Sequence, residues 1–183
     1  MKRVLVPLAP GAEEMETVII VDVLRRAGLE VLLAGLQGMQ PVRCSRGVVL
    51  CPDVALAAVT GTFDLIVLPG GAKGAESLAA SVAVLDLLRR QEREGLPIGA
   101  ICAAPIVLVA AGVGQGRALT SHPAVKEKVA ALGTYREERV VKDGPLITSR
   151  GPGTALEFAL ALVEELLGKA AADQVAAPML LPD

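Results

Sequence analysis

The chain has 183 residues, of which 52% are hydrophobic and only 2% aromatic, and its formal net charge is −2. This length predicts a single domain, residues 1–183, with an aliphatic core of the kind that suits a sheet covered by helices on both faces. The sequence has no basic run and no zinc-ligand spacing, and three cysteines do not make a disulfide framework. These features argue against a stable complex with nucleic acid and against a metal site.

The predicted elements alternate along the chain. Strands are expected at Lys2–Ala9, Glu30–Ala34, Asp64–Leu68, the short run that ends at Ile101, Val140–Lys142 and Leu146–Ser149. Helices are expected at about Glu13–Ala27, from a Ser81 cap to about Glu94, from about Ala103, at Pro123–Ala131, from Thr154 to about Leu167, and at Ala170–Val175. A small hairpin is expected from Val42–Cys44 and Gly47–Cys51, and Thr154 with Glu157 fits a capping box.

This alternation predicts an α/β fold, a doubly wound and mainly parallel sheet. Sites in such folds form beyond the carboxyl ends of the strands. Three segments lie there: Ala9–Glu16, Leu68–Gly74 and Ile101–Ala104.

We expect a cytoplasmic protein without membrane contact. The first apolar run is interrupted by Pro7 and Pro10, whereas a signal peptide needs a longer uninterrupted stretch. The segment 95–116 carries no charge and resembles a membrane span, but two prolines and five glycines break it. A buried strand, a turn and a buried helix explain it better.

Cys102 lies where a predicted strand turns into a predicted helix. Ala100 and Ala104, two residues before and after it, are both small, as a sharp strand-to-helix turn requires. Such a turn lifts the sulfur to the top of a sheet, where the helix N-terminus favours a thiolate. Cys102 is therefore predicted to be a nucleophile or a redox centre; the alternative is a small buried hydrophobic residue.

Glu16 lies in the first turns of the first predicted helix, on a face that continues with apolar residues at positions 19, 20 and 23. A carboxyl on an apolar face has a raised pKa and stays protonated near neutral pH. It is then able to donate a hydrogen bond to a thiolate or to move a proton. The alternative is an acid that only interacts with the helix N-terminus.

Backbone donors and one imidazole complete the candidates. Gly70 and Gly71 offer free N–H groups that predict half of an oxyanion hole, with the N–H of Ala103 as the other half; an ordinary turn is the alternative. His122 is the only histidine and so the sole candidate for a Cys–His pair, against the alternative of a solvated loop residue.

Three further features are interpreted as structural. Cys44 and Cys51 are seven residues apart without metal-ligand spacing, which favours packing over a redox role. The segment 151–154, Gly-Pro-Gly-Thr, lacks the lysine of a P-loop, so a tight turn is expected there and not a phosphate cradle.

Six motifs occur in order along nearly the whole chain: GAEEMET (11–17), CSR (44–46), VLPGG (67–71), AICA (100–103), TSHP (120–123) and TSRGPGT (148–154). Together they resemble the Parkinsonism-associated deglycase (DJ-one) branch of the PfpI superfamily. The resemblance implies a flavodoxin-like fold, a homodimer, and no cofactor or metal. The protease-like branch has a His directly after its Cys, where this chain has Ala103, and class I amidotransferases have a Glu two residues after their His, where it has Ala124. A protease or glutaminase triad is therefore not predicted.

The resemblance also implies residue roles. Cys102 would be the reactive, peroxide-sensitive cysteine, and Glu16 would hydrogen-bond its sulfur. Gly71 and Ala103 would supply backbone N–H groups, and His122 would sit beside the pocket. Pocket support would come from Glu13, Arg46 and Gly70, with Arg46 approaching from the partner subunit.

The resulting hypothesis is a cysteine-dependent protein and nucleotide deglycase and glutathione-independent glyoxalase. Its substrates would be methylglyoxal and glyoxal, free or as early adducts on amine, thiol or guanine groups, and its products lactate or glycolate. The alternative is a non-enzymatic oxidative-stress sensor and redox-dependent chaperone that uses oxidation of Cys102. A third possibility is a plain binding module with a buried Cys102.

Overall fold

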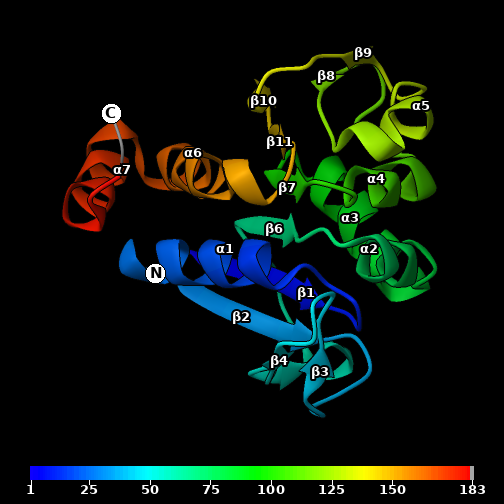
Figure 1. Cartoon of the computed structure of the whole chain (residues 1–183), viewed down its shortest axis with the longest axis horizontal. Helices are drawn as coiled ribbons and strands as arrows, with labels where there is room; N and C mark the ends of the chain where they lie inside the picture. The colour runs from blue at the N-terminus through cyan, green and yellow to red at the C-terminus, as the bar shows by residue number, and fades with distance from the viewer. Residues whose placement is uncertain (182–183) are drawn as a thin grey trace.

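A central sheet of seven strands organises the protein, which we describe from a computed structural model covering residues 1–181 (Figure 1). The strand order is β10-β11-β7-β6-β1-β2-β5. The strands are β1 (Arg3–Leu8), β2 (Glu30–Gly35), β5 (Val54–Ala55), β6 (Leu65–Leu68), β7 (Ile98–Ile101), β10 (Val140–Asp143) and β11 (Leu146–Ser149). Every neighbouring pair is parallel except β10 with β11, so the sheet is mainly parallel, as predicted.

Helices cover both faces of the sheet. One face carries α1 (Glu14–Arg26), α6 (Ala155–Leu167) and α7 (Lys169–Ala176), and the other carries α2 (Ala72–Ala79), α3 (Val82–Arg93), α4 (Pro105–Ala111) and α5 (Lys126–Val129). Successive side chains of a strand point to opposite faces. In β1, Val4 and Val6 accordingly join the core under α1 and α6, and Leu5 joins the core under α3 and α4. The predicted doubly wound, flavodoxin-like arrangement is confirmed.

Two small sheets lie outside the central one. The predicted hairpin is confirmed as the antiparallel pair of β3 (Val42–Arg43) and β4 (Val49–Leu50). β8 (Ala118–Leu119) and β9 (Thr134–Tyr135) form a parallel pair. Single turns of 3-10 helix occur at Leu56–Ala58, Pro123–Val125, Pro152–Thr154 and Ala177–Met179. Within residues 1–181, no helix is both long and apolar enough to cross a membrane.

The chain reverses its direction of winding between β1 and β6. From β1 it winds to β2 on one side, and from β6 it winds to β7 on the other. The loops that follow β1 and β6 therefore diverge, which leaves a crevice at the carboxyl ends of these strands. The Glu13 N–H donates to the Gly70 carbonyl at 2.9 Å and joins the two loops at the base of the crevice.

Two local predictions are wrong. The capping box does not form, because the Thr154 hydroxyl accepts from the Gly151 N–H at 3.1 Å and the Glu157 carboxylate accepts from Arg139 Nε at 2.9 Å. The helix after Cys102 begins at Pro105 and not at Ala103, because the intervening residues form the turn itself.

Candidate active site

Cys102 occupies a strained turn at the end of β7. Its φ of +63° lies in the left-handed region, which costs a residue with a Cβ about 1–2 kcal/mol. The backbone around it is held from two sides: its N–H donates to the Ser149 carbonyl at 2.9 Å, and its carbonyl accepts from the His122 N–H at 2.8 Å. The residue is largely buried, with 9% of its surface exposed.

Glu16 reaches the same point from the first turn of α1. The residue is fully buried, and its Oε2 accepts from the Gly70 N–H at 2.8 Å. Its own N–H donates to Oε2 of Glu13, the N-cap of α1, at 2.7 Å. Its Oε1 has no hydrogen-bond partner among the described residues. The Cys102 thiol lies close enough to this carboxyl that each group shifts the pKa of the other. The two residues that the sequence singled out therefore come together.

Burial raises the pKa of Glu16 to about 7, as the sequence predicted. Hydrogen bonds from Cys102 and Gly70 lower it, and the negative charge of Glu13 raises it further. Glu16 is therefore a carboxylic acid able to donate near neutral pH.

The thiol of Cys102 behaves differently from the sequence-based expectation. Burial raises its pKa to about 12, helped by the negative charge of Glu16, although the N–H groups of Gly71 and Ala103 lower it. The expectation that the helix end alone would favour a thiolate is wrong, because burial and Glu16 outweigh the two amides. With pKa values of about 7 and about 12, Glu16 and Cys102 together hold two protons below pH 7 and one above it. That one proton lies mainly on the sulfur, and the thiolate is the minor form in which Glu16 carries it instead.

The glycines after β6 allow the close approach of these groups. A Cβ at Gly70 would lie 2.6 Å from both the Cys102 Cβ and Glu16 Oε2. At Gly71, where φ is +87°, a Cβ would lie 2.4 Å from the Gly11 carbonyl oxygen. The N–H groups of Gly71 and Ala103 both lower the pKa of the thiol, so they face the charge that develops there. Their role as an oxyanion hole stays a prediction.

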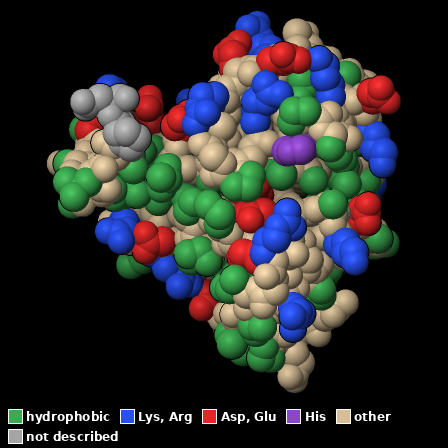
Figure 2. All heavy atoms as spheres, in the orientation of Figure 1, with side chains coloured by type: hydrophobic (Ala, Val, Ile, Leu, Met, Phe, Trp, Pro, Cys, Tyr) green, Lys and Arg blue, Asp and Glu red, His purple; other side chains and the backbone are tan. Residues whose placement is uncertain are grey.

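His122 lies at the surface beside the crevice, and Figure 2 shows it with basic side chains around it. Its Nδ1 accepts from the Ala124 N–H at 3.2 Å, so the imidazole stabilises the turn that follows it. Its backbone, as described above, holds the Cys102 carbonyl. No hydrogen bond joins the imidazole to the thiol within residues 1–181, and a catalytic role for His122 stays a prediction.

Glu14 is a residue that the sequence analysis missed. It is 6% exposed, and its carboxylate accepts from Ser45 Oγ and from the Arg46 N–H, each at 2.7 Å. Burial alone would raise its pKa, but these bonds and one from the Val48 N–H lower it to about 2. Glu14 thereby fixes the turn between β3 and β4 against α1. Its spacing in the sequence does not distinguish it from a surface acid.

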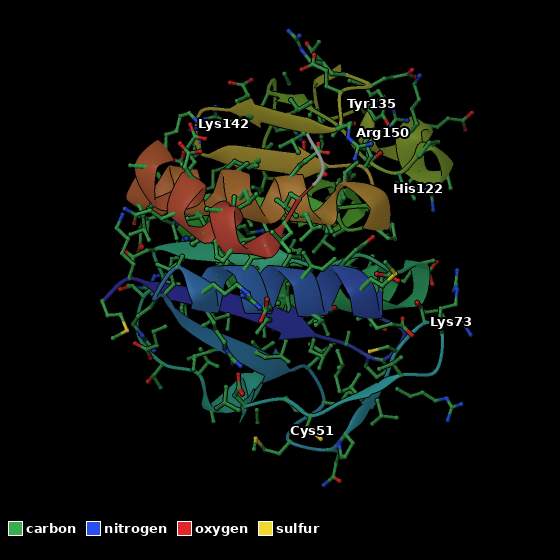
Figure 3. The ribbon with its side chains drawn as sticks, turned by 60° about the vertical axis from the view of Figure 1, so that its left-hand side comes forward. Cys51, Lys73, His122, Tyr135, Lys142 and Arg150 are labelled. Atoms are coloured by element: carbon green, nitrogen blue, oxygen red, sulfur yellow. The ribbon has the colours of Figure 1, made fainter. Side chains whose placement is uncertain are left out.

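The remaining cysteines lie away from this pair. Cys44 is buried at the β3–β4 turn, and burial with the charges of Glu14 and Glu13 raises its pKa to about 11. Cys51 is exposed, and Figure 3 shows it at the lower edge of the molecule, away from His122. Residues 1–181 contain no cluster of three or more His, Cys, Asp or Glu side chains arranged to hold a metal ion.

A doubly wound α/β sheet with a cysteine at a strained turn and a buried carboxylic acid beside it defines a class of proteins with a cysteine–carboxyl pair at the carboxyl ends of the strands. The chain belongs to the DJ-1/PfpI family, whose family model matches residues 2–165. It is 55% identical over 187 residues to the Parkinson disease protein 7 homolog of Danio rerio, covering 100% of this chain and 98% of that protein.

Two other relatives agree with this assignment. The crystal structure of Drosophila melanogaster DJ-1beta matches with a TM-score of 0.97 and 53% identity, covering 100% of this chain and 99% of that one. The glutathione-independent glyoxalase DJR-1.2 of Caenorhabditis elegans is 44% identical over 183 residues, covering 98% of this chain and 97% of that protein. The resemblance seen in the six motifs is confirmed.

Proposed function

We propose that this protein is a cysteine-dependent glyoxalase and deglycase that acts on methylglyoxal and glyoxal, free or as early adducts on amine, thiol or guanine groups. The observation that carries the proposal is the fully buried Glu16 carboxyl beside the Cys102 thiol, whose Oε1 has no hydrogen-bond partner among the described residues. A nucleophile next to an acid of pKa about 7 is suited to attack a carbonyl and then to move a proton. A relative named as a glutathione-independent glyoxalase supports the same reaction class.

The reaction begins with one proton on the pair, carried by Glu16. The Cys102 thiolate attacks the aldehyde carbon of methylglyoxal, and the new C–O⁻ group takes the proton from Glu16 to give a hemithioacetal. The N–H groups of Gly71 and Ala103 stabilise the negative charge before this transfer.

Glu16, now a carboxylate, removes the hydrogen from the former aldehyde carbon as a proton and returns it to the neighbouring carbon. The aldehyde carbon is thereby oxidised to a thioester and the ketone carbon is reduced to an alcohol, with no external oxidant. Water then cleaves the thioester, which releases lactate, or glycolate when glyoxal is the substrate, and restores the starting pair.

The test is steady-state turnover by purified protein, corrected for loss of free dicarbonyl catalysed by the buffer. Cys102→Ser removes the nucleophile and is expected to abolish turnover. Glu16→Gln removes the proton carrier and is expected to lower kcat by about 10²–10⁴-fold. Cys51→Ser, at an exposed thiol, is the matched control and should keep full activity. Full activity of Cys102→Ser on methylglyoxal would rule out the scheme.

A second candidate function uses the same residues without turnover. Hydrogen peroxide would oxidise the Cys102 thiolate to the sulfenate and, with a second equivalent, to the sulfinate, and partner proteins would read the change, as in a stress sensor or redox-dependent chaperone. The observation that favours it is that the Gly71 and Ala103 N–H groups and a protonated Glu16 form a ready donor set for sulfinate oxygens. Absence of corrected turnover, with selective peroxide oxidation of Cys102, would favour this candidate.

We also propose that the protein is a cytoplasmic homodimer. The largely apolar segment Val18–Leu24 of α1 mostly packs under α6, but Val18 itself is 48% exposed. Other exposed apolar side chains near it are Met15 at 55% on α1, and Val48 at 49% and Val49 at 52% at the hairpin. Sedimentation of the wild type and of Val18→Asp tests the dimer: a monomeric wild type at micromolar concentration would disprove it.

A further inference from the structure

We propose that a hollow beside the active site is a cationic entry that draws carbonyl compounds carrying a carboxylate or phosphate group to Cys102. The inference extends the proposed function from the neutral dicarbonyls methylglyoxal and glyoxal to carbonyl compounds that also carry an anionic group. It rests on that function only in taking Cys102 as the reacting atom.

The hollow has a volume of about 450 Å³. It is lined by Pro10, Gly11, Arg43, Cys44, Ser45, Arg46, Ala72 and Lys73. Two of these residues adjoin the groups that face the thiol. Ala72 follows Gly71, whose N–H lowers the pKa of Cys102, and a Cβ at Gly71 would touch the Gly11 carbonyl oxygen. Cys102 is not among the lining residues, so the hollow lies next to the loops around the sulfur and not directly over it.

Three cations line this hollow: Arg43, Arg46 and Lys73, all of them exposed. Within residues 1–181, eleven of the 18 Lys and Arg side chains form ion pairs, and three of the remaining seven are these. No carboxylate side chain is among the lining residues. Figure 3 places Lys73 on the same edge of the molecule as His122.

The acids nearest to this hollow leave its positive charge available. The Glu14 carboxylate is buried behind the turn and is engaged by the Ser45 hydroxyl and the Arg46 N–H. Glu16 is buried and points to Gly70, and it is neutral when it carries the proton of the pair. Glu13 accepts from the Glu16 N–H. None of the three pairs with a cation of the hollow.

The wall of the hollow is also fixed in place. Besides the Glu14 bonds, the Ser45 N–H donates to the Ala12 carbonyl at 2.8 Å, and the Gly11 N–H donates to the Arg43 carbonyl at 2.9 Å. Guanidinium groups bind carboxylate and phosphate in a fork geometry. A concave surface with charge of one sign concentrates ions of the opposite sign and raises their rate of encounter. The hollow is therefore built to favour anionic electrophiles over neutral ones.

The test compares alkylation of Cys102 by iodoacetate, an anion, with alkylation by neutral iodoacetamide. Mass spectrometry of the Cys102 peptide distinguishes alkylation of Cys102 from alkylation of the other cysteines. A change in the intrinsic reactivity of the Cys102 thiol affects both rates equally and cancels in their ratio. The double variant Arg43→Gln/Lys73→Gln is expected to lower this ratio about tenfold at low salt. A positive charge about 10 Å from the sulfur, at an effective dielectric constant of about 50, raises the local concentration of a monovalent anion about threefold. Removing two such charges therefore lowers the rate with iodoacetate about tenfold relative to the rate with iodoacetamide.

A matched control removes two unpaired, exposed cations from the opposite end of the sheet, as Lys2→Gln/Arg93→Gln. It changes the net charge equally and should keep the wild-type ratio. An equal fall in both double variants, or no fall in either, would overturn the proposal. Raising the salt concentration should also lower the wild-type ratio, since it screens the cations.

Protection by free anions identifies the group that the hollow prefers. Inorganic phosphate and acetate are added at matched ionic strength, with chloride as reference, and the rate with iodoacetamide is followed. Stronger protection by phosphate assigns phosphate-bearing substrates, and stronger protection by acetate assigns carboxylates. Equal rates in all three salts would contradict the entry site. Alkylation needs no turnover, so absence of glyoxalase activity would refute the proposed function and leave this test intact.

Discussion

Replacing Glu16 with glutamine should make the stability of the protein less dependent on pH. The wild-type carboxyl has its pKa raised from 4.5 to about 7 in the folded state by burial. A group whose folded pKa is raised favours folding fully below its unfolded pKa and loses that contribution as pH rises through the folded value. The rise in pKa from 4.5 to about 7, at about 1.4 kcal/mol per pKa unit, corresponds to about 3 kcal/mol of unfolding free energy. The wild type should lose this amount between about pH 4.5 and pH 8, and Glu16→Gln should not.

The measurement is urea unfolding of both proteins at pH 5, 6, 7 and 8. Glutamine has the same shape as glutamate and keeps an acceptor for the Gly70 N–H, so the difference between the two curves isolates the charge of the carboxyl. Titration of groups elsewhere is common to both proteins and cancels. The difference should grow in favour of Glu16→Gln with increasing pH. A constant difference across this range would refute the inference that burial raises the pKa of Glu16.

Three further predictions concern the backbone and the second acid. Gly70→Ala places a methyl group 2.6 Å from the Cys102 Cβ and should cost about 1–3 kcal/mol, measured by thermal unfolding, with Gly153→Ala, which meets nothing within 4 Å, as the neutral control. Because φ at Cys102 is +63°, Cys102→Gly should be more stable than Cys102→Ala by about 1 kcal/mol, measured by unfolding in denaturant. If the alanine variant were the more stable one, as is usual elsewhere in proteins, the turn would not be strained. The pKa of Glu14 is lowered to about 2, so its stabilisation is present above pH 4.5 and lost as pH falls toward 2. Glu14→Gln should therefore destabilise the protein at pH 7, by an amount that shrinks at pH 3.

The sequence predicted the parts of the site that depend on local pattern. Small residues around Cys102 indicated a sharp turn, the apolar face of α1 indicated a buried carboxyl at Glu16, and Gly70 with Gly71 indicated an open backbone after a strand. Each pattern spans a few residues, and parallel strands bring their carboxyl ends to one edge. The meeting of these groups was therefore predictable from the strand order of the fold class.

Other features depend on tertiary contacts that no local pattern encodes. Helix α2 was missed because it contains Gly74, which weakens a helix; the glycine is needed there because a Cβ would lie 2.7 Å from the Ala12 backbone. Glu14 acquires its role from a hairpin more than 30 residues away. The raised pKa of Cys102 follows from burial and from the distance to Glu16, which spacing in the sequence does not give.

The ends of the central sheet have a consequence for how the protein behaves at high concentration. One edge strand, β5, has only two residues. The other edge strand, β10, is antiparallel to β11 and carries Lys142, whose ammonium pairs with Glu165 on α6. Short or charged edge strands are poor templates for pairing with the backbone of another chain. Both edges therefore resist the strand addition that leads to fibres. The protein should stay monodisperse at concentrations where a protein with long, unprotected edge strands would form fibres.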